Sequence, residues 1–448
     1  MRSTEQGRPT RQTARDLALL IALTLGIHAP FIHQAFHVDD VQYLDVASNV
    51  FRNPLFPLDL QSVFEGKHLT LWAHSHPPLN SYVIAGLLLL NNRAASETFL
   101  HTAFLFFPTV ITVAFYFLAR RFVARPFVAT ALLATNPILI VCAHTLMTDI
   151  PLLAMWLCAT TSFVIGISQT RNWMVYLAAM PLTAACFYAY QGFALILLLA
   201  FYAMAKRRLG FRETLVLCAP VLFIAAWQLS GYMHRGTMYA SAMFEELGRR
   251  GWGRAVLKIK AGSSTLAYLA GIAVPFPFIF WRTRGSWKGS LIWVSLAVGV
   301  LGAYALPDDY SWPQRAFFAG CFGGGVALVI WTVGPLLTGA SQNRLASDDL
   351  FLWVWFAGML ITCVTVFLGG VARYLLPAYP ALILLFARSD EQTGNSPNRA
   401  FYGSLLAVQL VLGLGLAQAD YQFAATGRRE AYDFQRDYLR NNQPFLFS

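Results

Sequence analysis

The chain changes character at His37-Val38-Asp39-Asp40-Val41-Gln42-Tyr43, where a polar interval begins that runs to Asn80. One long apolar segment precedes this interval, and most of the other apolar segments follow it. The interval holds five of the 22 acidic residues, in a chain of which only 12% is charged. We therefore expect it to lie at a membrane surface, held in place by a frame of membrane-spanning segments.

Composition places the rest of the chain in a lipid bilayer. Hydrophobic residues make up 57% of the chain and charged residues 12%, whereas soluble domains carry about 25% charged residues. Many apolar runs reach the roughly 20 residues that a helix needs to cross the hydrocarbon core. These properties predict an all-α polytopic membrane protein.

Charge and cysteine content exclude other classes. The net charge of +11 is a topology signal, since loops facing the cytoplasm are rich in lysine and arginine. It does not indicate nucleic-acid binding, because no basic face on a soluble domain accompanies it. All six cysteines fall within apolar segments without the CxxC spacing of a metal site, and we expect them to be small core residues. A basic tail, residues 1–16, leads into the first span without a cleavable signal peptide.

Run lengths predict about thirteen membrane-spanning helices. The predicted spans are 17–36, 101–119, 127–146, 150–168, 173–190, 192–205, 213–231, 264–281, 290–306, 316–337, 350–370, 374–388 and 400–418. The apolar run 79–90 is too short to cross and is predicted to lie at the interface. The basic short loops then share the side of the N-terminus, which places that side in the cytoplasm. The outer face is expected to carry the first outer loop 37–100, residues 232–263 and the C-terminal tail.

A helix lying on the membrane surface is predicted directly after Asp40. Apolar residues recur there at helical spacing, at Val41, Leu44, Ala47 and Val50/Phe51. Asp39 and Asp40 stand at its N-terminus, where one of them could cap the helix, although only one residue can be the cap. A pair of carboxylates beside a bilayer, with imidazoles further along the chain, could instead perform acid–base chemistry.

Two further motifs on the outer face have alternative interpretations. His74 and His76 could ligate a metal, but histidine pairs in loops are more often solvated, so a divalent cation stays open and no cofactor is assigned. Asp149 lies at a break between two spans, where Thr148 or Asp149 could cap the next helix and Pro151 would fit its first turn. The same position makes Asp149 a candidate acid.

Basic residues on this face could bind a lipid phosphate. Arg373 lies at the outer end of a predicted span, where it could either snorkel to the surface or bind phosphate. The loop 245–260 interleaves basic and apolar side chains, as expected of a segment lying against anionic head groups or a lipid phosphate. Its basic residues include Arg249, Arg250, Arg254 and Lys258.

Four short motifs occur in the order seen in a known family. They are Asp-Asp-Val-Gln-Tyr (Asp39 to Tyr43) after the first span, His-Pro-Pro-Leu (His76 to Leu79), Thr148-Asp149 between two spans, and Arg-Tyr-Leu-Leu-Pro (Arg373 to Pro377). Together they resemble the integral-membrane C-type glycosyltransferases (GT-C), in particular the protein O-mannosyltransferases and the aminoarabinose transferases that modify lipid A. The resemblance extends over about residues 17–419, and the ordered set is more specific than any one motif.

The resemblance implies an enzyme that transfers a hexose or pentose from a polyprenyl-phosphate donor to a hydroxyl of a lipid, protein or polymer acceptor. It implies a transferase domain at 17–419 in a plasma (inner) membrane, with the reaction on the extracytoplasmic face and a short outer tail at 420–448. Asp39 matches the functional acid of the family, Asp40 the acidic residue beside it, and Asp149 the acid of the second outer loop. The candidates for substrate or phosphate binding are Gln42, Tyr43, His74, His76, Arg249, Arg250, Arg254, Lys258, Arg373 and Tyr374.

Two positions depart from the family pattern, because some relatives carry a basic residue in place of Gln42 and lysine in place of His76. If those residues bind the donor phosphate, this chain must use other cations, such as Arg373 or the basic loop. The alternative function is a transporter or flippase of lipid-linked or small substrates. Coupled transporters usually place ionisable groups near the bilayer midplane, whereas all 22 acids here can be assigned to loops or span ends.

Overall fold

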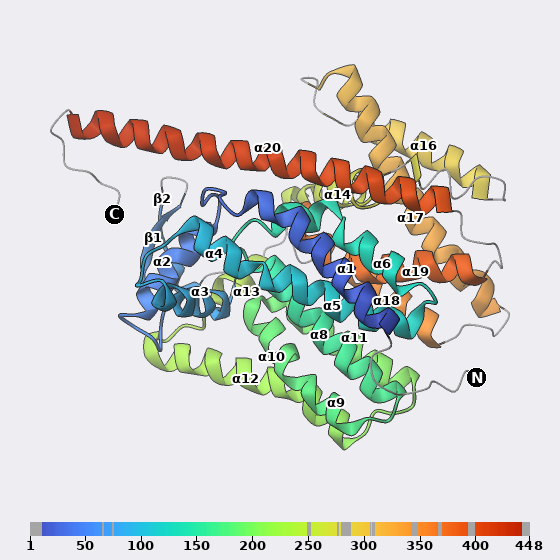
Figure 1. The fold of residues 1–448 in the computed structure, drawn as a ribbon, viewed down its shortest axis with the longest axis horizontal. Coiled ribbons are helices and arrows are strands. Elements are labelled where there is room, and N and C mark those ends of the chain that lie inside the picture. Colours follow the sequence, from blue (N-terminus) through green and yellow to red (C-terminus); the bar gives the residue numbers. More distant parts are fainter. Residues whose placement is uncertain are drawn as a thin grey trace.

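Helices make up almost all of the computed structural model, which Figure 1 shows as a bundle of long helices with one small hairpin of strands. The structure describes residues 11–64, 67–73, 76–248, 252–275, 277–278, 288–304, 306, 310–341, 347–365, 370–392 and 399–440. The first half of the chain forms α1 (Arg11–His28), η1 (Ala29–Phe31), α2 (Asp40–Val50), η2 (Leu71–Ala73), α3 (Leu79–Leu90), α4 (Glu97–Phe104), α5 (Phe106–Phe122), α6 (Pro126–Ala134), α7 (Pro137–Cys142), α8 (Asp149–Ser168), α9 (Asn172–Leu177), α10 (Ala179–Tyr188), η3 (Tyr190–Gly192), α11 (Phe193–Ala205) and α12 (Phe211–Arg235). The second half forms α13 (Ser241–Gly248), α14 (Trp252–Tyr268), η4 (Leu269–Ala273), α16 (Lys288–Tyr304), α17 (Trp312–Ser341), α18 (Ser347–Thr365), η5 (Ala372–Ala378), α19 (Tyr379–Gln392) and α20 (Arg399–Arg440). Strands β1 (Gln61–Phe64) and β2 (Lys67–Thr70) pair antiparallel, with Gln61 opposite Thr70.

Seven helical stretches of the described chain are long and apolar enough to cross a membrane. They are Arg11–Phe31, Glu97–Phe122, Asp149–Ser168, Phe211–Arg235, Trp312–Val333, Ser347–Thr365 and Arg399–Asp433. Shorter apolar helices occupy Leu79–Leu90, Tyr190–Ala205 and Trp293–Tyr304. The prediction of a polytopic α-helical membrane protein is therefore confirmed, whereas the count of thirteen spans and the non-crossing of 79–90 stay predictions.

The predicted span 127–146 is wrong as a single helix, because Asn136 and Pro137 divide it into α6 and α7. A proline disfavours the helical conformation of the residue before it, and Asn136 accordingly has a ψ of 125°. The Asn136 side chain accepts hydrogen bonds from the backbone N–H groups of the two residues after Pro137, which caps the new helix. The predicted span 374–388 is also divided, into the 3-10 turn η5 and α19.

The last helix is longer than predicted. A span at 400–418 followed by a tail was expected, but α20 continues without interruption to Arg440. Its 42 residues correspond to about 63 Å, twice the roughly 30 Å thickness of a hydrocarbon core. The residues beyond the apolar part include many good helix formers, so the change to polar sequence did not end the helix. Figure 1 shows the C-terminal half of α20 reaching the end of the bundle that carries α2, α4 and the β-hairpin.

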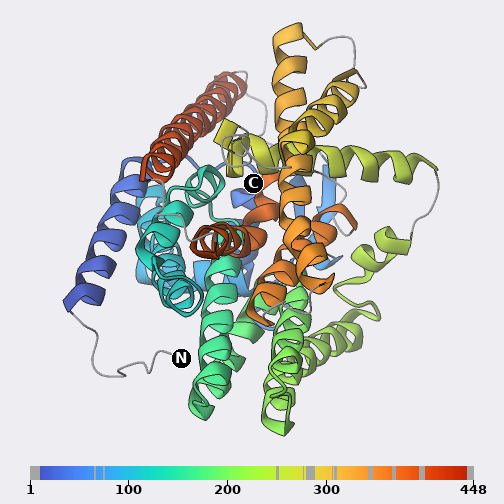
Figure 2. The same ribbon diagram turned by 90° about the vertical axis from the view of Figure 1, so that its right-hand side faces the viewer.

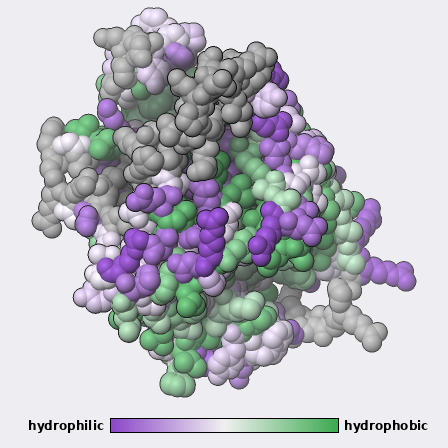
Figure 3. All heavy atoms as spheres, turned by 90° about the vertical axis from the view of Figure 1, so that its left-hand side faces the viewer, coloured by the Kyte–Doolittle hydropathy of each residue, from purple (hydrophilic) through white to green (hydrophobic). Residues whose placement is uncertain are grey.

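The buried core centres on α8, where Leu152, Leu153 and Trp156 have no exposed surface. Helices α5 and α10 pack along it. The elements of the first outer loop gather at one end of this core, on the left of Figure 1. Figure 3, which faces that end, shows hydrophilic side chains across it with hydrophobic surface beside them. The arrangement suits a polar site built at the end of an apolar bundle.

Helix α2 forms where the sequence predicts a helix, and its predicted apolar face is wrong only at Val41. Leu44, Ala47, Val50 and Phe51 lie in or against the core, as that face requires. Tyr43, Val46 and Ala47 are buried, whereas Val41 is 51% exposed. The reason is tertiary, because α2 packs against α3 and the core and does not lie alone on a lipid surface. The face that turns inward therefore begins with an acid, Asp40, which has no exposed surface.

Helices α16 and α17 form a closely packed hairpin that projects from the body at the top of Figure 2. A Cβ atom on Gly299 would overlap the backbone oxygen of Ala319, and one on Gly323 would overlap that of Ser295. Small residues let two helix backbones approach closely, which is the common mode of helix packing in membranes. The hairpin lies apart from the polar end described above.

Candidate functional site

Arg373 lies between two acidic side chains that come from different parts of the chain. Its Nη2 atom is 3.4 Å from Asp39 Oδ2, and its Nε atom is 3.8 Å from Asp149 Oδ2. Asp39 directly precedes α2, Asp149 is the first residue of α8, and Arg373 belongs to η5. Three candidates that were chosen separately from the sequence thus form one cluster, which we call the Arg373 cluster.

Solvent reaches the Arg373 cluster unevenly. The side chains of Asp39 and Arg373 keep 25% and 24% of their surface exposed, whereas Asp149 keeps 10%. Burial lowers the pKa of Arg373, but the electrostatic effects of Asp149, Tyr374 and Asp39 outweigh it and raise that pKa above its ordinary value. The cluster therefore holds a permanent cation, with Asp39 as the carboxylate that a substrate can reach.

Among the residues that the structure describes, capping hydrogen bonds account for neither Asp39 nor Thr148. Asp39 occupies the N-cap position of α2, yet its side chain makes no capping hydrogen bond within the described structure. Thr148 occupies the N-cap position of α8 and, in the same part of the chain, also makes none with its side chain. Asp149 in the first turn of α8 is favoured there by the partial positive charge of the helix N-terminus. Both carboxylates lie within ion-pair distance of Arg373.

Two further side chains contact the guanidinium, and a third lies against the residue before Asp149. Arg373 Nη1 is 3.3 Å from the sulfur of Met147, and its Cζ lies 5.6 Å from the centroid of the Tyr374 ring. The hydroxyl of Tyr43 lies 3.5 Å from Thr148 Oγ1, which links α2 to the residue before Asp149. Tyr43 and Tyr374 therefore lie in or beside the cluster, and their role in substrate binding stays a prediction. Nothing in the sequence pointed to Met147.

Asp40 has a different role from its neighbour. It has no exposed surface, its Oδ1 accepts a hydrogen bond of 2.7 Å from Leu146 N, and its Oδ2 accepts one of 3.2 Å from His37 N. Burial raises the pKa of Asp40 to about 7, against the opposing effects of the His37 charge and of these two backbone donors. The prediction that Asp40 supports the site fits this geometry, but a direct role on substrate does not, because both oxygens are used and buried.

We expect Asp40→Asn to cost about 1–3 kcal/mol of unfolding free energy at pH 5, because one of the two backbone N–H groups loses its acceptor. A carboxyl whose pKa is raised on folding stabilises the fold most at low pH, and this stability is lost as the pH rises towards about 7. The destabilisation should therefore be smaller at pH 8. Thermal unfolding in detergent at both pH values measures this, and an equal loss at both would contradict the assigned role of Asp40.

Asn80 was missed as a functional candidate, although it ends the polar interval. It is fully buried, and its Nδ2 donates a hydrogen bond of 2.5 Å to the backbone oxygen of Leu146. The backbone of Leu146 is thus held at its oxygen by Asn80 and at its N–H by Asp40. The sequence feature that could have identified Asn80 is its amide side chain at the start of the otherwise apolar run 79–90.

The remaining binding candidates are scattered. Gln42 is buried on α2, and His76 is partly buried just before α3. Lys258 lies on α14, one turn before Ala261, whose backbone touches the position that a Cβ on Gly370 would occupy. The segment before η5 thus meets α14. His74, Arg249, Arg250 and the side chain of Arg254 lie outside the described residues.

The described part of the chain brings no set of possible metal ligands together. No group of three or more histidine, cysteine, aspartate or glutamate residues there could hold a metal ion. The metal interpretation of His74 and His76 is not tested by this, because His74 lies outside the described residues.

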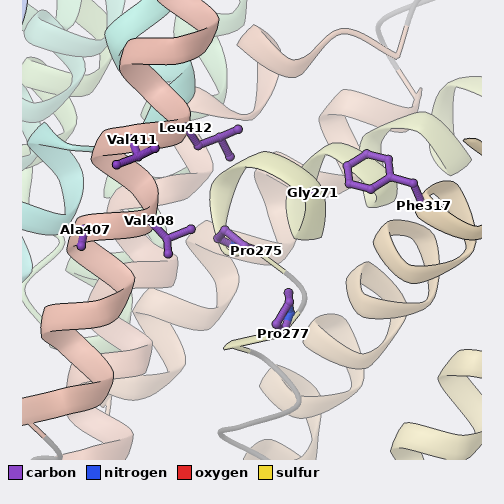
Figure 4. Close-up of a pocket in the computed structure, with 8 residues that line it drawn as sticks. All are labelled: Gly271, Pro275, Pro277, Phe317, Ala407, Val408, Val411 and Leu412. Atoms are coloured by element: carbon purple, nitrogen blue, oxygen red, sulfur yellow. The ribbon is translucent and has the colours of Figure 1, made fainter. Parts of the chain in front are cut away.

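An apolar cavity of about 500 Å³ lies between η4, α17 and α20. Its eight lining residues, shown in Figure 4, are Gly271, Pro275, Pro277, Phe317, Ala407, Val408, Val411 and Leu412. All of them are apolar, so this cavity offers no group for proton transfer or phosphate binding. The Arg373 cluster is the better place for chemistry.

Three solved membrane glycosyltransferases have a similar arrangement of helices. The oligosaccharyltransferase AglB of Archaeoglobus fulgidus, solved with an inhibitory peptide and a dolichol-phosphate, is 13% identical over 91% of this chain and 56% of its own, with a TM-score of 0.49. ArnT of Cupriavidus metallidurans bound to undecaprenyl phosphate is 15% identical over 91% of this chain and 77% of its own, with a TM-score of 0.43. The arabinosyltransferase EmbB of Mycobacterium smegmatis is 12% identical over 95% of this chain and 42% of its own, with a TM-score of 0.44.

Comparisons of the sequence, in contrast, found no similar protein or family. No family model matches the sequence, and no curated protein matches it either. This chain also spans only 56% of the length of the archaeal oligosaccharyltransferase.

Proposed function

We propose that this chain is a membrane glycosyltransferase that moves a sugar from a polyprenyl-phosphate donor to an acceptor hydroxyl. The observation that carries the proposal is the position of Arg373, between the partly exposed Asp39 and the nearly buried Asp149. A carboxylate and a guanidinium within one partly exposed cluster supply the two groups that this transfer needs, one for the incoming hydroxyl and one for the departing phosphate.

The reaction assigns a role to each member of the Arg373 cluster. The acceptor oxygen forms a bond to the anomeric carbon, the bond between that carbon and the phosphate oxygen breaks, and the phosphate leaves with the electron pair. Asp39 takes the proton of the acceptor hydroxyl, and Arg373 binds the negative charge that grows on the phosphate. Asp149 holds the guanidinium in place. The 3.4 Å contact between Arg373 and Asp39 must open to admit the phosphate.

A lipid-linked donor fits the surroundings better than a soluble nucleotide sugar. The Arg373 cluster lies at the end of an apolar helical bundle, where a phosphate on a polyprenyl chain would meet it. The sequence holds no glycine-rich phosphate loop of the kind that binds nucleotides. We place the reaction on the extracytoplasmic face of a plasma (inner) membrane, with residues 17–419 as the transferase domain.

We expect the purified protein in liposomes to transfer sugar from a polyprenyl-phosphate donor and not from a nucleotide sugar. The assay would offer both donor classes, with a hexose and with a pentose, to extracted envelope lipids and proteins and would follow the product by mass spectrometry. Transfer from a nucleotide sugar without any polyprenyl lipid would overturn the proposal. Asp39→Asn protein serves as the matched control for background transfer.

A further inference from the structure

The outer half of α20 is fastened to the segment that leads into the Arg373 cluster. Asp420 Oδ2 accepts a hydrogen bond of 2.8 Å from Gln34 Nε2 and lies 3.2 Å from His37 Nε2. A second contact follows along the helix, where Arg428 Nη1 lies 2.6 Å from Glu97 Oε2. These contacts join a C-terminal helix to residues 34–37 and 97, so α20 contacts both ends of the first outer loop.

A chain of contacts runs from Asp420 to both carboxylates of the cluster. His37 donates its backbone N–H to Asp40 Oδ2 at 3.2 Å, and its Nδ1 lies 3.7 Å from the same oxygen. Asp40 Oδ1 accepts a hydrogen bond from Leu146, in the turn that leads into Asp149. Asp39 itself stands between His37 and Asp40 in sequence. A displacement of His37 would therefore move the backbone of both candidate acids.

The contacts around His37 are largely protected from solvent. The His37 side chain is 7% exposed and that of Asp420 is 24% exposed. The titratable groups facing His37 are Asp40 from α2, Asp420 from α20 and His101 from α4. Burial lowers the pKa of His37, but the hydrogen bond and charge of Asp420, the charge of Asp40 and a backbone contact with Ala35 outweigh it and raise that pKa. The Asp420 and Asp40 side chains thus favour the protonated form of His37.

We infer that Asp420, acting through His37 and Asp40, is a positioning residue that holds Asp39 and Asp149 in the geometry needed for transfer. The inference rests on the function proposed above for the Arg373 cluster. It gives the outer half of α20 a part in the reaction that the sequence does not predict, because the sequence indicates only a short tail at 420–448.

The test begins with Asp420→Asn, which keeps the shape of the side chain and removes its charge. We expect kcat to fall about tenfold to a hundredfold, because small displacements of reacting groups are costly, while the KM for the lipid donor stays unchanged. Activity of the wild-type protein should fall at high pH, when His37 loses its proton. In Asp420→Asn this fall should begin at a lower pH, because His37 without the Asp420 charge loses its proton sooner. Asp420→Glu should restore part of the rate, and Glu430→Gln, an exposed acid on the same helix, is the matched control.

A double-mutant cycle with His37→Gln separates positioning from a general loss of fold. If Asp420 acts through His37, adding Asp420→Asn to His37→Gln should change kcat by less than twofold. Full and additive losses from the two substitutions would overturn the inference, and so would a kcat and pH profile of Asp420→Asn that match wild type.

Hydrogen exchange supplies a readout that does not depend on activity. Asp420→Asn should speed the exchange of the backbone amides in 37–41 and 144–149, and Glu430→Gln should not. Unchanged exchange in both segments would overturn the inference even if activity fell. Absence of transfer by the wild-type protein would count against the proposed function instead, and the exchange result would still decide whether α20 positions these segments.

Discussion

Replacing Asp39 with asparagine should lower transfer by about 100-fold or more, because assistance by a placed base contributes about 10² to 10⁴ to the rate. Asparagine has almost the same shape but cannot take a proton from the acceptor. Asp39 is the carboxylate for this role because it keeps 25% of its surface exposed, whereas both oxygens of Asp40 are occupied by backbone donors. Initial rates with a polyprenyl-phosphate donor measure the effect.

Stability should barely change in Asp39→Asn, which separates this variant from one that misfolds. The ion pair with Arg373 is partly exposed and contributes about 1 kcal/mol or less. A matched control is Asp45→Asn on the same helix, where the asparagine oxygen can still accept the hydrogen bond that Ser62 now gives to Asp45. Near-normal transfer by Asp39→Asn, together with an unchanged melting temperature, would show that the chemistry does not use this carboxylate.

Replacing Arg373 with alanine should lower kcat/KM for the lipid donor by about 10² to 10³, the usual cost of removing a group that binds developing charge. Asp149 holds the guanidinium from one side, so it can stay in place when its contact with Asp39 opens to admit the phosphate. The kcat/KM of Arg373→Lys should lie between those of the wild type and Arg373→Ala, because lysine keeps the charge but loses the planar fork that binds two phosphate oxygens. Rates at varied donor concentration measure both variants.

Arg373→Ala leaves Asp149 without its cation, so part of its defect could come from a weaker fold. The lysine variant answers this, because it keeps the ion pair that holds Asp149. The matched control is Arg429→Ala, an exposed arginine on α20. Arg428 is unsuitable because it pairs with Glu97. Equal kcat/KM values for the lipid donor in Arg373→Ala and Arg429→Ala would show that Arg373 does not bind the phosphate.

Sequence reasoning was strongest where a property depends on local composition. Long apolar runs must become helices in a bilayer, since only a helix satisfies its own backbone groups there, and the seven long apolar helices follow from this. The helix after Asp40 and the turn before Asp149 were also predictable, because periodicity and a proline act within a few residues. Asp39, Asp149 and Arg373 stood out because charge is rare in such a chain.

Only the tertiary structure decided which of these groups meet and which face inward. Asp39 and Arg373 are 334 positions apart, and no local pattern encodes a contact at that separation. Neighbours on a helix point about 100° apart, so packing of α2 against α3 buried Asp40 and left Asp39 beside Arg373. The contacts of α20 were likewise decided by the tertiary structure. Its helix-forming residues fixed its conformation, but docking on His37 and Glu97 required the folded first outer loop to be present.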